Sequence, residues 1–137
     1  MTYRVAYYMH EELRADAGAV VELFARRERR IAPHGRRANT YWFAPLGGED
    51  VLRADVDFDA GRAALRWLAD GTFAADLEVG GAIVVLESSD VPPVTIPGGL
   101  ARVSIDGVRR AVIGLVETGQ RPVVVEWHRI SDGVRRS

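Results

Sequence analysis

Glu126 and His128 are the residues whose types and spacing come nearest to a catalytic acid–base pair, in the segment ETGQRPVVVEWHRI. On an extended strand, residues two apart point to the same face and lie about 7 Å apart. A general base and the group that orients it need direct hydrogen-bond contact. The sequence also offers no nucleophile to go with the pair. We therefore interpret both residues as structural, with Trp127 as a core anchor of the last strand, and expect no catalytic residue and no enzymatic activity.

The other residues that commonly carry out chemistry form no recognised motif. His10, His34 and His128 lie far apart, and none has a second histidine at metal-ligand spacing. The chain has no cysteine, which excludes disulfides, thiolate zinc sites and cysteine nucleophiles. No HExxH, GxSxG or GxxxxGK[ST] pattern occurs. We expect neither a metal nor a cofactor.

The composition is that of a soluble globular protein. The 137 residues are enough for one domain, which we expect to span residues 1–137, and 47% of them are hydrophobic and 27% charged. No apolar run is long enough to cross a membrane, and the N-terminal residues lack the apolar segment of a signal peptide. We expect a cytoplasmic protein with no membrane partner.

Hydrophobic spacing predicts two helices and several short strands. Residues 16–30 and 104–118 carry apolar residues at helical spacing, with Asp16 and Ser104 as N-caps and Gly119 at a C-cap. Alternating or β-branched runs bounded by Gly, Pro and Asp predict strands. These strands are predicted at residues 2–9, 39–46, 51–59, 62–69, 72–79, 82–87 and 121–130, with a Pro/Gly loop over residues 88–99. The predicted fold is α+β, an antiparallel meandering sheet with two α-helices packed on one face.

Charge is distributed unevenly along the chain. Residues 49–90 contain three arginines and ten acidic residues, whereas the segments before and after them each carry a net charge of +3. Asp55, Asp57 and Asp59 alternate with apolar residues, which predicts a solvent-exposed acidic face. An isolated sheet gains nothing from such crowding, so we favour a contact surface for a basic partner over an ordinary solvated face. The predicted contact residues are Asp55, Asp57, Asp59, Asp70, Asp76 and Glu78, with Trp42 or Tyr41 as the aromatic anchor.

A basic patch from Arg26 to Arg37 offers an alternative. The stretch ARRERRIAPHGRR holds six arginines in thirteen residues and could contact phosphates. Glu22 and Glu28 interrupt it, and the whole chain has a net charge of −1, which favours a solvated helix face. A nucleic-acid-binding module therefore stays the second hypothesis, and the first includes no direct contact with nucleic acid.

The C-terminal half resembles a known family. The stretch VSIDGVRRAVIGLVETGQRPVVVEWHR resembles the end of the first-numbered immunity family of bacterial polymorphic toxin systems. The matching residues are Val108, Arg109, Arg110, Ala111, Val112, Glu117, Thr118, Gly119, Arg121, Pro122, Val125, Glu126 and Trp127. Upstream, VDFDAGRAALRWLADG resembles the family's acidic strand and the strand after it, through Gly61, Leu65 and Trp67. The resemblance covers residues 51–128.

The resemblance implies an immunity protein encoded beside a toxin. Such proteins are α+β inhibitors that bind the toxin domain and occlude its active site, and their usual partners resemble nucleic-acid deaminases, including those that act on cytosine in double-stranded DNA. We expect a 1:1 complex with a cognate deaminase-like toxin. A toxin that grips a polyanion carries a basic cleft, and an acidic sheet face would compete for that cleft.

Overall fold

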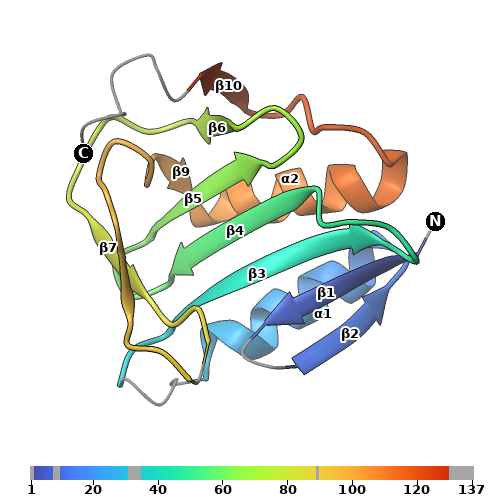
Figure 1. Ribbon diagram of the computed structural model, residues 1–137, viewed down its shortest axis with the longest axis horizontal. Helices are drawn as coiled ribbons and strands as arrows, with labels where there is room; N and C mark the ends of the chain where they lie inside the picture. Colours follow the sequence, from blue (N-terminus) through green and yellow to red (C-terminus); the bar gives the residue numbers. More distant parts are fainter. Residues whose placement is uncertain (1, 8–9, 31–34, 89, 130–137) are drawn as a thin grey trace.

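A computed structural model describes residues 2–7, 10–30, 35–88 and 90–129. As predicted, the fold is α+β, with a large antiparallel sheet and two helices (Figure 1). The strands of the sheet follow the order β10-β6-β5-β4-β3-β1-β2, and the short β9 pairs with β5. These strands are β1 (Tyr3–Tyr7), β2 (His10–Arg14), β3 (Ala38–Pro45), β4 (Leu52–Asp57), β5 (Arg62–Trp67), β6 (Thr72–Ala75), β9 (Val103–Ser104) and β10 (Glu126–Arg129).

Both helices begin where the sequence predicts, α2 also ends there, and α1 ends at Glu28, two residues before the predicted end. Helix α1 (Ala17–Glu28) starts after Asp16, whose Oδ1 accepts a hydrogen bond of 2.8 Å from the backbone of Ala19. Helix α2 (Ile105–Thr118) starts after Ser104 and ends at Gly119, which takes the left-handed conformation with φ of 73°. Neither helix is long and apolar enough to cross a membrane.

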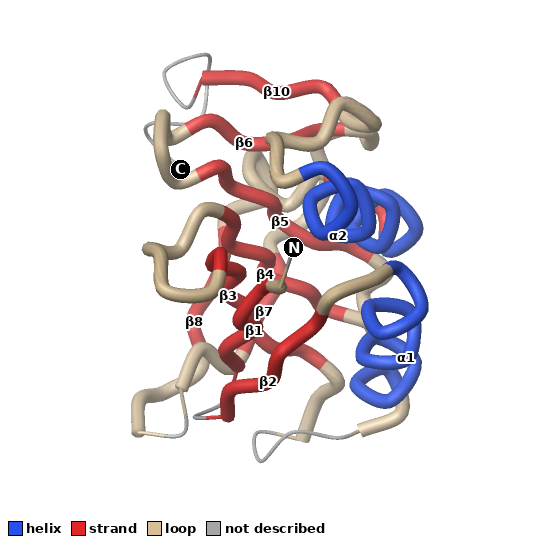
Figure 2. Tube along the Cα trace, turned by 90° about the vertical axis from the view of Figure 1, so that its right-hand side faces the viewer, coloured by secondary structure: helices blue, strands red, loops and turns tan. Residues whose placement is uncertain are grey.

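The main core lies between these helices and one face of the sheet. Phe24 of α1 and Leu115 of α2 are fully buried there, against Tyr41 of β3 and Leu65 of β5. Burial of one such side chain stabilises the fold by about 1.5–3 kcal/mol. Figure 2 shows both helices on the same side of the sheet, which leaves the other face for different contacts.

A two-stranded hairpin covers one end of that other face. It consists of β7 (Ile83–Val85) and β8 (Val94–Ile96), which lie on the side of the sheet away from the helices in Figure 2. Phe73 is buried beneath it in a second apolar cluster. The strand predicted at residues 82–87 is present as β7, but it pairs with β8 in a separate sheet instead of continuing the meander, and Val94–Ile96 forms a strand where we predicted only a loop. The central strands therefore have apolar cover on both faces at this end.

Two other elements differ from the prediction. Strand β2 was not predicted, because its charged sequence shows no clear alternation. Strand β10 starts at Glu126 rather than at residue 121, and Val123 before it is 93% exposed. Trp127 does anchor this strand: its Nε1–H donates to the Pro122 carbonyl at 2.6 Å, and its ring lies 6.3 Å from that of Trp67.

Candidate binding face of the sheet

One row of side chains crosses the sheet from β10 to β2, on the face away from the helices. Each member is the direct partner of the next in the strand register, and residues directly opposite each other share a face. We call this set the transverse row. Its members, from β10 to β2, are His128, Phe73, Arg66, Arg53, Trp42, Ala6 and Glu11.

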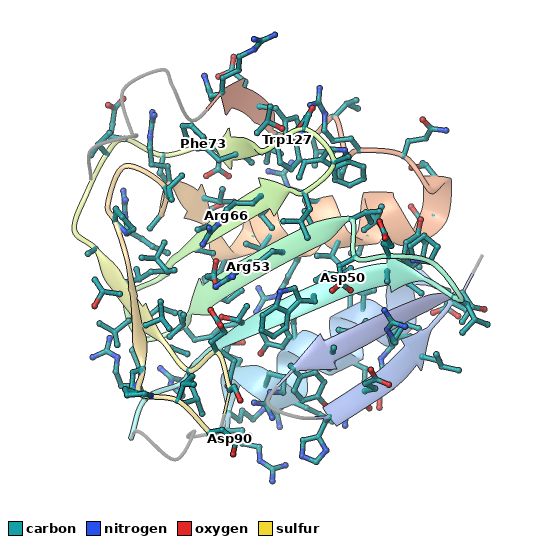
Figure 3. All side chains as sticks on the ribbon, viewed as in Figure 1. Asp50, Arg53, Arg66, Phe73, Asp90 and Trp127 are labelled. Atoms are coloured by element: carbon teal, nitrogen blue, oxygen red, sulfur yellow. The ribbon has the colours of Figure 1, made fainter. Side chains whose placement is uncertain are left out.

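The middle of the row and its β2 end are open, and the β10 end is partly covered. Phe73 is buried beneath the His128 ring, with their centroids 5.6 Å apart. The side chains of Arg66 and Arg53 are 24% and 17% exposed, and that of Glu11 is 68% exposed. Figure 3 shows Arg66 and Arg53 next to each other on β5 and β4, in front of the sheet. The open part of the row therefore runs from Arg66 to Glu11, with Trp42 and Ala6 half-buried between them.

A buried carboxylate holds the two arginines in place. Asp55 on β4 is 0% exposed, and it accepts hydrogen bonds from Arg53 Nη2 at 3.1 Å and Arg66 Nη2 at 3.0 Å. The Thr40 hydroxyl donates a third at 2.7 Å. Arg53 also reaches Glu87, at 2.7 Å. Because Asp55 is bonded to both guanidinium groups, their positions are fixed before any partner arrives.

The charge of Arg53 is strongly supported by its surroundings. Partial burial opposes the charged form, but the carboxylates of Asp55 and Glu87 outweigh it, and the pKa of Arg53 is raised above its ordinary value. The guanidinium carbon lies 5.5 Å from the centroid of the Trp42 ring, within cation–π range. Tryptophan and arginine are the residue types that most often dominate protein interfaces.

The predicted acidic contact face is not formed as expected. Asp55 and Asp57 are fully buried, so the prediction that they lie on a solvent-exposed face is wrong. Asp57 accepts a hydrogen bond of 2.9 Å from Arg36, and Asp59 accepts two of 2.8 Å from the backbone and side chain of Arg37. Folding has brought arginines of the N-terminal basic segment onto this acidic strand.

The remaining predicted acidic residues are spread over other parts of the sheet. Asp70 accepts from the Thr72 hydroxyl at 2.6 Å and from Arg121 at 3.0 Å. Asp76 accepts from the backbone and hydroxyl of Ser104, at 2.7 and 2.8 Å. Glu78 is exposed. The acidic block is therefore largely neutralised within the fold, and the charge separation along the sequence does not persist as one acidic surface.

Of the two predicted aromatic anchors, only Trp42 is accessible. Tyr41 is fully buried on the helix face, and its hydroxyl accepts a hydrogen bond of 3.4 Å from Arg27. Burial raises the pKa of Tyr41 to about 12. Trp42 is half-buried and lies in the open part of the transverse row.

Most arginines of the predicted basic patch form hydrogen bonds or ion pairs within the fold. Arg27 is buried and donates to the Asn39 side chain at 2.7 Å. Arg26 pairs with Glu12 at 3.2 Å, and the two arginines at positions 36 and 37 pair with aspartates as described above. Residues 31–34, which include His34, lie outside the described residues. Four of the six arginines of the patch are therefore engaged within the fold, and Arg29 and Arg30 are exposed.

Glu126 and His128 line one pocket of about 440 Å³ beyond the covered end of the row. Arg102 and Glu78 also line it. Among the described residues, no hydrogen bond or ion pair joins Glu126 to His128. No serine, threonine or tyrosine is among the described residues that line this pocket. The pair is thus accessible but lacks the direct contact that a general base and the group orienting it need.

Within residues 2–7, 10–30, 35–88 and 90–129, no group of three or more His, Asp or Glu side chains could hold a metal ion. A scan of protein-family models found no match to the sequence, and a search of curated proteins found none either. Arg53 and Arg66 were not predicted as site residues. Their signal was present in the alternation of β4 and β5, which places both on the polar face of the sheet.

Proposed function

We propose that this chain is a non-enzymatic inhibitor that binds a partner protein through the open part of the transverse row. The observation that carries the proposal is the position of Trp42 and the two arginines beside it. Trp42 is half-buried and lines a pocket on this face, and Arg53 and Arg66 are held by the buried Asp55. A surface that is ordered before binding loses less conformational entropy on association, and so binds more tightly for the same contacts.

The charges of this surface favour a protein partner over nucleic acid. Arg53 and Arg66 are both engaged by Asp55, and Glu87 takes a further hydrogen bond from Arg53. Two cations are thus matched by two carboxylates. Affinity for a polyanion comes from cationic side chains that neutralise phosphates and release their counterions. An arginine that is already paired with a carboxylate contributes little to this release. Aromatic and arginine contacts surrounded by polar residues are typical of the centre of a protein interface.

The resemblance of residues 51–128 to an immunity family supports a toxin of the deaminase type as the partner. Under this proposal the contact set changes from the one predicted from sequence. Trp42 stays as the aromatic anchor, and Asp55 acts indirectly by positioning the two arginines. Glu11 and Glu87, which lie beside Trp42, supply negative charge that can compete for a basic active-site cleft.

The proposal requires that a deaminase domain is encoded immediately upstream of the gene for this chain, and it is tested with that domain. Residual deamination is measured as the purified chain is added. We expect activity to fall linearly and reach its minimum at one chain per toxin. The absence of such a deaminase gene, or full activity in excess chain, would refute the proposal. Loss of activity far below one equivalent would instead indicate an enzyme that modifies the toxin.

A further inference from the structure

We infer that the pocket beside Trp42 receives an arginine side chain of the partner. The pocket has a volume of about 510 Å³ and opens on the face away from the helices. Trp42, Ala6, Glu11 and Glu87 are among its lining residues. This inference rests on the proposed function in one respect, because the proposed function identifies the protein that supplies the arginine.

The strand register explains why a pocket forms here. Ala6 on β1 is opposite Trp42 on one side and opposite Glu11 on the other. Because alanine carries only a methyl group, the space between the indole and the carboxylate stays empty above it. Arg53 occupies the far side of Trp42, as its partner on β4. The near side of the indole is therefore the side that borders the pocket.

The two carboxylates of the pocket have capacity for another donor. One oxygen of Glu87 accepts from Arg53 at 2.7 Å, and a carboxylate has further lone pairs on its second oxygen. Among the described residues, Glu11 makes a long contact with Arg4, at 3.9 Å, which is beyond hydrogen-bond distance. Both side chains are accessible, since Glu87 is 33% exposed and Glu11 more so. An incoming cation would find acceptors on two sides of the pocket.

The combination of an indole wall and carboxylates favours arginine over other side chains. A guanidinium group is planar, so it can stack on Trp42 while its edge donates to a carboxylate. An acidic side chain would be repelled by Glu11 and Glu87. A neutral aliphatic side chain would leave the carboxylates desolvated without a partner. Deaminase toxins that bind a polyanion need basic side chains around their active site, which makes an arginine available there.

The test uses N-acetyl-arginine-N-methylamide as the probe, titrated into the full chain and followed by NMR. The Ala6 methyl group and the Trp42 Nε1–H report on the pocket. We expect their signals to shift and saturate with millimolar affinity, and N-acetyl-norleucine-N-methylamide to leave them in place. The double variant Glu11→Gln/Glu87→Gln should weaken binding by about fivefold or more. Ala6→Phe, which fills the pocket, should abolish it.

Glu22→Gln is the matched control, because it removes an exposed carboxylate of α1, on the other side of the sheet. The inference is overturned if the norleucine probe shifts these signals as strongly as the arginine probe, if neither probe shifts them, or if the double glutamine variant binds like the parent. Failure here is distinct from failure of the proposed function. If the chain inhibits the deaminase but does not bind the arginine probe, only the inference about the pocket is refuted. If it binds the probe but does not inhibit the deaminase, only the proposed function is refuted.

Discussion

Arg53 lies directly opposite Trp42 in the β3–β4 register, and its guanidinium carbon is 5.5 Å from the centroid of the indole ring. The same guanidinium donates to Asp55 and to Glu87. Three contacts thus fix one side chain at the centre of an open sheet face. The proposed interface depends on this pair of a fixed arginine and the tryptophan beside it.

Replacing Trp42 should weaken binding far more than it weakens the fold. We expect Trp42→Ala to cost at least about 2 kcal/mol of binding free energy, close to a 30-fold loss of affinity, because buried tryptophan anchors contribute this much. Titration against the deaminase domain measures the affinity. Trp127→Ala is the control, since Trp127 contacts Trp67 on the helix face. It should lower the urea midpoint more than Trp42→Ala does, and an unchanged affinity for Trp42→Ala would contradict the account.

Replacing Asp55 should destabilise the whole domain. Asp55→Asn leaves Arg53 and Arg66 without their buried counter-charge, and loss of one partner of a buried ion pair costs about 3–5 kcal/mol. Urea denaturation measures this loss. Asp59→Asn removes a carboxylate from the exposed pair with Arg37 and should cost at most about 1 kcal/mol. Equal losses for the two variants would show that Asp55 is not the structural centre of the row.

Much of the fold could be predicted from local patterns. The caps of helices α1 and α2 depend on neighbouring residues, so Asp16 and Ser104 were sufficient to place both starts and Gly119 the end of α2. Strand β2 could not be recognised, because it is an edge strand whose side chains are mostly charged. The three-residue β8 was hidden among prolines, and only its contact with β7 makes it a strand.

The site was less predictable because it depends on register. The period-two pattern of β4 correctly separated Arg53 and Asp55 from the apolar face, but it carries no information on what covers the polar face. Of the two aromatic residues predicted as anchors, Trp42 is the accessible one. Its alignment with Arg53 and Arg66 depends on the register between β3, β4 and β5. That register is set by the lengths of the two hairpin loops, which no local sequence pattern predicts. The arginines that neutralise the acidic segment likewise come from distant parts of the chain.

Acid should weaken the contact between β2 and α1. Glu12 accepts hydrogen bonds from Tyr7, Arg14 and Arg26, and these outweigh the opposing effect of burial and lower its pKa from 4.5 to about 2. Since the folded-state pKa is below the unfolded value, the stabilisation is complete above pH 4.5 and is lost as pH falls from 4.5 towards 2. Urea denaturation across this range should show that the difference in the free energy of unfolding between wild type and Glu12→Gln becomes smaller as the pH falls. A difference that stays constant would contradict this role, and Glu22→Gln controls for loss of an exposed carboxylate.

Asp76 should act on the start of α2 rather than on a partner. Asp76→Ala removes two hydrogen bonds to Ser104, the N-cap of this helix, and should lower stability by about 1 kcal/mol. Its affinity for the deaminase should equal that of wild type. Parallel measurements of the urea midpoint and of binding distinguish the two roles. A loss of affinity without a loss of stability would restore Asp76 to the contact surface.

Glu126 and His128 should be dispensable for inhibition. The double variant Glu126→Gln/His128→Ala removes the carboxylate and the imidazole from the pocket beside β10 and leaves the open part of the transverse row intact. We expect it to inhibit deamination at the same one-to-one ratio as wild type. If the variant folds but no longer inhibits, the pair takes part in function and the interpretation of these residues as structural is wrong.

The most direct test of the binding face is hydroxyl-radical footprinting of the chain with and without the deaminase domain. Oxidation is compared at Trp42 on the open face and at Val21 on the exposed side of α1. We predict strong protection of Trp42 in the complex and unchanged oxidation of Val21. Protection of Val21 with Trp42 still fully reactive would place the partner on the helix side and contradict the account.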